Sequence, residues 1–372
     1  MKFTVNREKL THCLQQAVGV AEKKTTMPIL ANLLIEANDN FLTLTATDLE
    51  VCLVNRCEAK VINPGRFTVP AKSFFEIIKE FPREIVEITL NENNQIELTS
   101  NKAQFRIVGI APEDFPNFPK GEKAEFFELP SNALRNMIER TAFSISSDEM
   151  RYSLNGILLE TAPEGGHVVL RLVSTDGHRL SFTEHRLDLK AAEQPFKDKV
   201  VLPKKGVMEL KRLLDDSDQA VKFAFDGNNG IATYGGTTIY MRRIVGEFPD
   251  YHKVIPTEIK RSAMINRQSF IGSLKRMLLI ASAKHKLVRF DFSNERLEMS
   301  CQNPELGTAR EEIDVRLDGT PLTIGFNPRY FLDALAVIDE KEIEIGLVDE
   351  LSPAIIVSKP SNFKCVIMPM RL

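Results

Sequence analysis

The alternation of apolar and polar positions follows one pattern three times along the chain. The copies read FTVNREKLTHCL from Phe3, FELPSNALRNMI from Phe127 and AMINRQSFIGSL from Ala263. Each begins with a short alternating stretch, and apolar residues then recur with i, i+4 spacing, as at Leu10 and Leu14. This order predicts a strand, a turn and then a helix with one buried face.

A second strand–turn–helix pattern follows each of these copies. It reads FTVPAKSFFEII from Phe67, VVLPKKGVMELK from Val200 and LTIGFNPRYFLD from Leu322, with Pro70, Pro203 or Gly325 after the strand. Proline and glycine commonly end a strand in this way. The two patterns together predict six helices, at residues 7–16, 72–80, 131–140, 204–212, 267–276 and 328–337.

The two patterns occur in the same order and at intervals near one third of the 372 residues. Shorter echoes support the repeat, since LTLTATD resembles LRLVSTD and EDFPNF resembles GEFPDY. Three domains of one type are therefore predicted, at residues 1–124, 125–256 and 257–372. Alternating stretches such as QIELTS and FRIVGI lie between the helices, so we expect an α+β fold with antiparallel sheets.

Composition limits the class of protein. A hydrophobic content of 43% and a charged content of 27% are ordinary for a soluble globular chain. The opening MKFTVNREKL lacks the apolar core of a signal peptide, and no apolar stretch approaches the ~18 residues of a membrane span. We therefore expect a cytoplasmic protein without a membrane partner. The five cysteines form no CxxC pair, which favours buried free thiols over disulfides or a metal site.

The charge is unevenly distributed. A net charge of −3 argues against a nucleic-acid-binding protein. The six predicted helices nevertheless contain fourteen Lys and Arg against six Asp and Glu, so the remainder of the chain is strongly acidic. Helices that share one surface would attract a polyanion there. Ordinary solvated helix faces are the alternative reading.

Motifs of common enzymes are missing: the sequence has no GxGxxG after a strand, no GxxxxGK[ST], no GxSxG and no HExxH. The best catalytic candidate is STDGHRLSF, in which Asp176 and His178 lie two residues apart. Gly177 between them favours a turn. A turn packed against its own domain, a binding site and a catalytic pair remain three readings, in that order of preference.

The chain ends in VIMPMRL, which is more apolar than most chain ends. Methionine side chains adapt to varied partners, and proline stiffens the backbone. The pattern therefore predicts a functional surface at Met368–Met370 rather than a frayed end.

The sequence resembles the bacterial DNA polymerase III beta subunit family, the sliding clamps. The matching stretches run from residue 1 to residue 372 and are MKFTVNRE, PILANLL, TATDLE, FTVPAKSFF, EDFPNF, RYSLNG, STDGHRL, LPKKGVMEL, FPDYHKVIP, GFNPRYFLDAL and VIMPMRL. STDGHRL and the MPMRL ending are the most specific of them. The resemblance implies a head-to-tail homodimer whose six domains form a ring around double-stranded DNA, with helices lining the hole and sheets outside.

The resemblance also implies what the protein does. Such a clamp is a non-catalytic processivity factor without cofactor or metal, which a separate clamp loader places on DNA. It tethers DNA polymerases and other proteins that carry short clamp-binding motifs. Weak contacts with phosphate, independent of base sequence, suit sliding.

Three sets of site residues follow from the resemblance. The DNA-facing positions are Lys24, Lys72, Tyr152, Lys204, Lys205, Lys286 and Arg329. The partner-peptide cleft comprises Arg151, Leu154, Thr175, Gly177, His178, Arg179, Leu180, Pro249, Lys253, Val254, Val366, Ile367, Met368, Pro369, Met370 and Arg371. The dimer interface comprises Phe105 and Ile107 of one chain and Leu279 and Ile280 of the other.

Two positions beside the predicted cleft depart from the family pattern. Ser153 stands where an aromatic residue is common, and Lys253 where arginine is frequent. Serine offers less stacking area and lysine lacks the bidentate fork of arginine, so we expect altered partner preferences. Two other hypotheses remain: an enzyme that uses Asp176 and His178, and a specialised paralogue of the housekeeping clamp.

Overall fold

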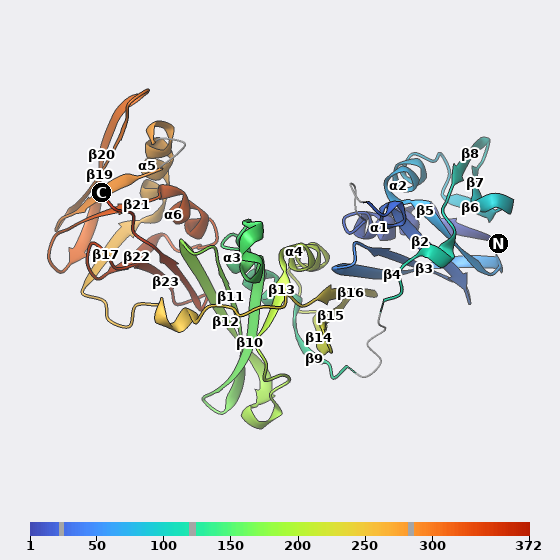
Figure 1. Ribbon diagram of the computed structural model, residues 1–372, viewed down its shortest axis with the longest axis horizontal. Coiled ribbons are helices and arrows are strands. Elements are labelled where there is room, and N and C mark those ends of the chain that lie inside the picture. Colours follow the sequence, from blue (N-terminus) through green and yellow to red (C-terminus); the bar gives the residue numbers. More distant parts are fainter. Residues whose placement is uncertain (22–25, 119–123, 282–285) are drawn as a thin grey trace. The chain divides into compact units, whose positions relative to one another are not determined.

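The computed structural model describes residues 1–21, 26–118, 124–281 and 286–372. All six predicted helices are confirmed, with bounds that differ by a few residues at most (Figure 1). They are α1 (Arg7–Ala17), α2 (Ala71–Lys79), α3 (Ser131–Ala142), α4 (Lys204–Leu213), α5 (Arg267–Ile280) and α6 (Pro328–Leu335).

An asparagine at the end of a strand, or directly after it, starts three of these helices. The Asn6 side chain accepts hydrogen bonds from the backbone N–H groups of Glu8 and Lys9, at 3.0 and 3.1 Å. Asn266 caps α5 and Asn327 caps α6 in the same way, each at 3.0 Å. An N-cap side chain satisfies backbone donors that the first helical turn leaves unpaired. These caps explain why the strand–turn–helix pattern is so sharp in the sequence.

The strands account for most of the remaining chain, and every ladder between them is antiparallel, as predicted. In the N-terminal third they are β1 (Lys2–Asn6), β2 (Asn32–Asn38), β3 (Phe41–Thr47), β4 (Val51–Asn63), β5 (Gly65–Pro70), β6 (Ile85–Leu90), β7 (Gln95–Ser100) and β8 (Ala103–Val108). In the middle they are β9 (Phe127–Pro130), β10 (Gly156–Glu164), β11 (His167–Thr175), β12 (Arg179–Lys190), β13 (Val200–Pro203), β14 (Ala220–Asp226), β15 (Asn229–Tyr234) and β16 (Thr237–Arg242). In the C-terminal third they are β17 (Arg261–Asn266), β18 (Val288–Phe292), β19 (Arg296–Asn303), β20 (Gly307–Asp318), β21 (Leu322–Phe326), β22 (Glu342–Leu347), β23 (Ala354–Ser358) and β24 (Phe363–Ile367).

The chain forms two compact units, each with its own sheet. The first unit contains Met1–Arg135 and Lys205–Arg243. Its strands run in the order β8-β7-β6-β1-β4-β16-β15-β14-β9, and β3, β2 and β5 branch from β4. The long strand β4 pairs with β3, with β1 and, at Val51–Val54, with β16. Helices α1 and α2 pack side by side in this unit and bury Leu10 and Phe74 completely.

The second unit contains Asn136–Lys204 and Ile244–Leu372. Its strand order is β13-β10-β11-β12-β24-β23-β22-β17-β20-β19-β18-β21. Strand β12 pairs with β11 on one side and with β24 on the other, so the last strand of the chain lies next to a strand of the middle third. This pairing brings the C-terminus beside the STDGHRL turn.

A cluster of phenylalanine rings forms the centre of the C-terminal core under α5 and α6. Phe331 lies 5.1 Å from Phe326 and 5.6 Å from both Phe270 and Phe290, measured between ring centroids. All four rings are buried. Aromatic pairs at such distances add to the stabilisation from burial.

We predict that Phe331→Ala lowers the free energy of unfolding by about 3–5 kcal/mol, because it leaves a cavity among the four rings. The measurement is chemical denaturation followed by circular dichroism. Leu351→Ala is the control, since Leu351 is 73% exposed and its loss should change stability by less than about 0.5 kcal/mol. Equal effects of the two substitutions would contradict this assignment of the core.

Candidate functional site

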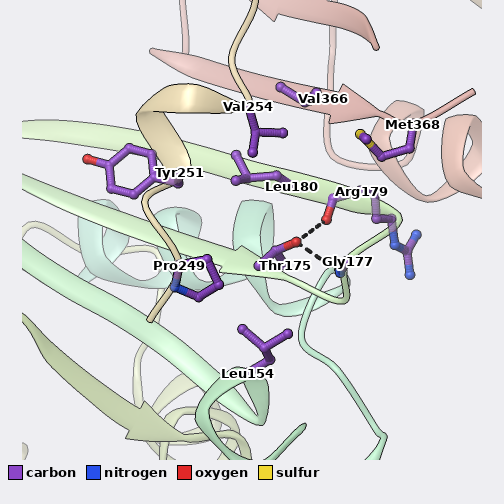
Figure 2. A pocket seen from close by; sticks show the side chains of 10 residues that line it. All are labelled: Leu154, Thr175, Gly177, Arg179, Leu180, Pro249, Tyr251, Val254, Val366 and Met368. Atoms are coloured by element: carbon purple, nitrogen blue, oxygen red, sulfur yellow. Dashed lines mark hydrogen bonds between the residues drawn. The ribbon is translucent and has the colours of Figure 1, made fainter. Parts of the chain in front are cut away.

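A pocket of about 140 Å³ lies in the second unit, at the place where β11, β12 and β24 end or begin. Its lining is largely apolar and comes from four separate stretches of chain (Figure 2). The lining residues are Leu154, Thr175, Gly177, Arg179, Leu180, Pro249, Tyr251, Val254, Val366 and Met368. All of them except Tyr251 are positions that the family resemblance assigned to the partner cleft.

The STDGHRL segment forms a tight turn between β11 and β12. The Thr175 hydroxyl donates to the Arg179 carbonyl at 2.6 Å and accepts from the Gly177 N–H at 3.1 Å (Figure 2). Gly177 has φ 86°, a left-handed conformation that costs other residues energy. Asp176 completes the turn, because its Oδ1 accepts from the N–H groups of His178 and Arg179 at 2.9 and 3.1 Å.

The same turn recurs between β3 and β4 in the first unit. Thr47 bonds to the Val51 carbonyl and to the Leu49 N–H, while Asp48 Oδ1 accepts from the N–H groups of Glu50 and Val51. Leu49 occupies the place of the glycine with φ 79°. The echo between TATD and STD in the sequence is therefore a repeated hydrogen-bonded turn.

Arg179 joins three elements behind the pocket. Its guanidinium donates to Asp176 at 3.1 Å, to Asp333 of α6 at 2.7 Å and to the Phe143 carbonyl at 2.6 Å. It also lies 4.8 Å from the centroid of the Tyr330 ring. With these partners the guanidinium charge is neutralised, so Arg179 fixes the shape of the pocket wall.

The C-terminal residues are held on both sides of Pro369. The Met368 N–H donates to the His178 carbonyl at 2.9 Å, and the Met370 N–H donates to the Gly325 carbonyl at 2.8 Å. Val366 lines the pocket, whereas the next residue, Ile367, belongs to the C-terminal core. Successive side chains of a strand point to opposite faces, which explains this division.

Tyr251 is the lining residue that sequence reasoning missed. Its hydroxyl donates to Glu160 of β10, and Arg171 and Lys199 lie 3.8 and 3.3 Å from that carboxylate. Burial and the hydrogen bond to Glu160 raise the pKa of the Tyr251 hydroxyl, which therefore stays protonated. The echo between EDFPNF and GEFPDY was the available signal, because it places an aromatic residue at the equivalent position of both segments.

Four further predicted cleft residues do not line the pocket: Arg151, His178, Lys253 and Arg371. Arg151 donates to the Asp176 carbonyl at 3.2 Å, and the exposed His178 ring stacks on Tyr330 at 6.3 Å. Lys253 is 81% exposed in its side chain and lies 3.4 Å from Asp250. Arg371 is also exposed.

The predicted DNA-facing residues have different surroundings. Lys72, Tyr152, Lys286 and Arg329 are exposed, while Lys24 lies outside the described residues. Lys204 is also exposed, and its ammonium donates to the Ser147 hydroxyl at 3.1 Å. Lys205 differs from them, because it forms an ion pair with the buried Asp48 carboxylate and donates to the Val20 carbonyl at 3.0 Å. The ammonium charge of Lys205 is therefore largely neutralised by Asp48 within the first unit.

The predicted interface residues lie on strand β8 and at the end of helix α5. Phe105 and Ile107 are on β8, and Phe105 is 45% exposed. Leu279 and Ile280 end α5, and Leu279 is 74% exposed. Large apolar side chains with such exposure commonly mark an interaction surface when they cluster.

The catalytic reading of Asp176 and His178 finds little support in the geometry. Both oxygens of Asp176 are used by its own turn and by Arg179, and the His178 ring packs on Tyr330. Among the described residues, no group of three His, Cys, Asp or Glu side chains is arranged to hold a metal ion. Over the same residues, no helix is long and apolar enough to cross a membrane.

Family models for three parts of one protein match the chain in order. They are the N-terminal, central and C-terminal domains of the DNA polymerase III beta subunit, at residues 1–119, 128–250 and 252–371. The chain belongs to the DNA polymerase III beta subunit family. It has the three-domain clamp fold of that family, and its function is that of a DNA sliding clamp, the processivity factor of replication.

Individual members of the DNA polymerase III beta subunit family agree with this assignment over their full lengths. The chain is 35% identical to the beta sliding clamps of Pseudomonas aeruginosa and of Escherichia coli, with complete coverage of both sequences in each comparison. The crystal structure of the Pseudomonas aeruginosa beta subunit superposes with a TM-score of 0.92 over all of both chains. The Bacillus subtilis clamp, 27% identical, superposes with a TM-score of 0.93 over 100% of this chain and 99% of that one.

The adjacent residues Lys204 and Lys205 allow a direct test of their different surroundings. We predict that Lys205→Met lowers the free energy of unfolding by about 1–3 kcal/mol, because Asp48 stays buried without its cation. Lys204→Met should change it by less than about 0.5 kcal/mol. Urea denaturation of both variants measures the difference, and an equally stable Lys205→Met protein would show that the ion pair contributes nothing.

Proposed function

We propose that two copies of this chain join head to tail into a ring around double-stranded DNA. In this proposal a clamp loader opens and closes the ring, and the pocket beside the C-terminus binds short segments of DNA polymerases and other proteins. The observation that carries the proposal concerns two sheet edges. Among the described residues, neither edge has the partner strand that is found at the equivalent places in the repeat.

The repeat joins its domains by one kind of strand pairing. Strand β16 closes the β14-β15-β16 series and pairs with the start of β4. Strand β24 closes the β22-β23-β24 series and pairs with the start of β12. The third series is β6-β7-β8, and the third long strand is β20. Repetition therefore predicts that β8 pairs with the start of β20.

Both of these edges are open among the residues that the structure describes. β8 pairs only with β7. β20 pairs with β19 along Gly307–Asp314 and with β17 along Val315–Asp318, so the first part of β20 has one free side. An exposed strand edge is a ready template for pairing with another chain. A contact of one edge with the other is heterologous, and two copies can close such a contact into a ring.

Apolar side chains accompany both edges. On β8, Val108 is 64% exposed in addition to Phe105. Near the start of β20, Leu306 is 64% exposed, and Leu279 is the nearby apolar residue predicted from the sequence. Val108 and Leu306 were not among the predicted interface residues. Their burial would supply the apolar centre that a stable interface requires.

The pocket suits an extended peptide with bulky apolar side chains. Leu154, Leu180 and Val366 form apolar walls, and exposed Pro249 lies at the rim. A few anchoring side chains usually provide most of the binding energy in such a pocket. Because the peptide must become ordered, we expect affinity on the order of micromolar, which lets partners exchange.

The chain itself then performs no chemical step. In the proposal, sequence-independent contacts with phosphate come from exposed basic residues such as Lys204 and Arg329, and the closed ring provides retention. ATP hydrolysis belongs to the loader. A partner bound to the ring is held near the primer end at high effective concentration.

The decisive experiment tests topology. The protein is loaded onto nicked circular DNA with a clamp loader, separated from free protein, and the DNA is then linearised. Retention on circles and rapid loss from linear DNA are the expected results. Loss from both at the same rate, or salt-resistant binding to one sequence, would contradict the clamp mechanism.

We predict that Leu279→Asp converts the dimer into a monomer at micromolar concentration, because it places a charge in the apolar centre of the interface. Sedimentation velocity measures the change. Leu351→Asp is a matched control, since Leu351 is 73% exposed and Leu279 is 74% exposed. Dimerisation that survives Leu279→Asp, or that is lost equally in both variants, would show that the interface is elsewhere.

We predict that Met368→Ala weakens the binding of polymerase-derived peptides roughly thirtyfold, equivalent to about 2 kcal/mol, because it removes an apolar wall of the pocket. Deletion of Met368–Leu372 should abolish binding and leave the dimer assembled. Fluorescence anisotropy with a labelled peptide is the measurement. Met208→Ala, on the exposed side of α4, is the control. Unchanged affinity in the truncated dimer would contradict the placement of the peptide site.

A further inference from the structure

The turn between β19 and β20 is a third copy of the turn that follows β3 and β11. LEMSCQN, which ends at Asn303, occupies the place of LTLTATD and LRLVSTD in the repeat. Asn303 Oδ1 accepts from the Glu305 N–H at 3.0 Å, just as Asp48 and Asp176 accept from the N–H two residues further on. Asn303 therefore stands at the position of these two aspartates.

Each of the two aspartates is paired with a cation. Lys205 forms an ion pair with Asp48 and donates to the Val20 carbonyl, just beyond the C-terminal end of α1, at 3.0 Å. Arg179 donates to the aspartate of its own turn at 3.1 Å and to the Phe143 carbonyl, directly after α3, at 2.6 Å. In both turns a cation thus connects the aspartate to the chain that follows the first helix of its domain.

Asn303 makes the same connection with a neutral amide. Its Nδ2 donates to the carbonyl of Ile280, the last residue of α5, at 3.0 Å. Asn303 is only 9% exposed, so both hydrogen bonds of its side chain are largely shielded from water. One amide, which accepts and donates at once, therefore replaces the carboxylate and the cation of the other two turns.

The two segments that Asn303 connects carry exposed apolar side chains. Leu279 lies at the end of α5 and is 74% exposed, and Leu306 lies directly before β20 and is 64% exposed. Both belong to the proposed interface between two copies. A side-chain link between the two segments reduces the number of arrangements open to the separated chain, and such preorganisation favours binding.

We propose that Asn303 is a positioning residue of the face with which one copy meets the next, an inference that rests on the proposed ring. It holds the turn with Leu306 against the end of α5 before the second copy arrives. A neutral amide suits a junction that must open, because separation of the copies leaves no charge at this position without its partner. The two junctions within one chain do not have to separate, and there Asp48 and Asp176 keep their ion pairs.

The test compares the dissociation constants of the full-length dimer and its Asn303→Ala variant, measured by sedimentation over a series of concentrations. Loss of the two hydrogen bonds should weaken each junction about fivefold. Because a ring of two copies contains the junction twice, its dissociation constant should rise roughly 25-fold.

A second variant, Asn303→Asp, separates the two hydrogen bonds. It keeps the acceptor for the Glu305 N–H and removes the donor to the Ile280 carbonyl, so it should also weaken the dimer. The measurement is made in about 0.5 M salt, which screens any cation of the second copy. This variant alone tests the proposal if Asn303→Ala fails to fold.

Asn32→Ala is the matched control, because Asn32 is 3% exposed and its amide donates to the Thr68 hydroxyl at 3.1 Å, in a strand that is neither of the two proposed edges. It should lower stability comparably and leave the dissociation constant of the dimer within about twofold. A dimer that Leu279→Asp disrupts, but that both Asn303 variants leave unchanged, would overturn this inference and not the ring.

Equal weakening of the dimer by Asn32→Ala would also overturn the role of Asn303, since the effect would then be one of general stability. A wild-type protein that is monomeric at micromolar concentration would overturn the proposed ring and this inference together.

Discussion

The pairing of the last strand of one repeat with the long strand of the preceding repeat is the constraint on which the architecture depends. It occurs at β16 with β4 and at β24 with β12, in each case through four or five residue pairs. Backbone hydrogen bonds and the alternation of side chains fix such a junction to one register, because a slip by one residue would exchange the buried and exposed faces. The second and third repeats therefore each contain the strand that joins them to the preceding repeat.

The candidate peptide pocket is a consequence of one of these junctions. The β24–β12 pairing places Val366 and Met368 beside the turn that follows Thr175. The turn is held by Thr175 and Asp176, and Arg179 connects it to α6. The pocket therefore needs residues from both the middle and the last parts of the chain, and its side chains are positioned before any ligand arrives.

Much of the fold could be predicted from the sequence. The six helices could be predicted because two strand–turn–helix patterns each recur three times with one apolar face, and the asparagine caps at Asn6, Asn266 and Asn327 sharpen the boundaries. The family resemblance supplied most of the residues that line the pocket. The alternation of side chains along a strand could alone have shown that Ile367 points to the core while Val366 lines the pocket.

Other features depend on contacts that sequence patterns do not record. Tyr251 lines the pocket because Glu160, far away in the sequence, accepts a hydrogen bond from its hydroxyl. Lys205 looks like its neighbour Lys204 in the sequence, yet a buried carboxylate from another part of the chain holds its charge. The contact of the Cys13 thiol with the Arg56 carbonyl likewise depends on how α1 packs on β4. Such side-chain partners are decided by tertiary packing.

In the proposed ring, the edges of β8 and β20, which are open among the described residues, make each chain comparable to a bifunctional monomer in polymer chemistry, with one complementary end of each kind. Monomers of this type can grow into open filaments or close into cycles, and the angle set by each junction determines which product forms. Closure of a small cycle is an intramolecular step, so it gains over chain growth as the protein becomes more dilute. A substitution that alters the angle of a junction without weakening it would therefore shift the product from closed rings to filaments.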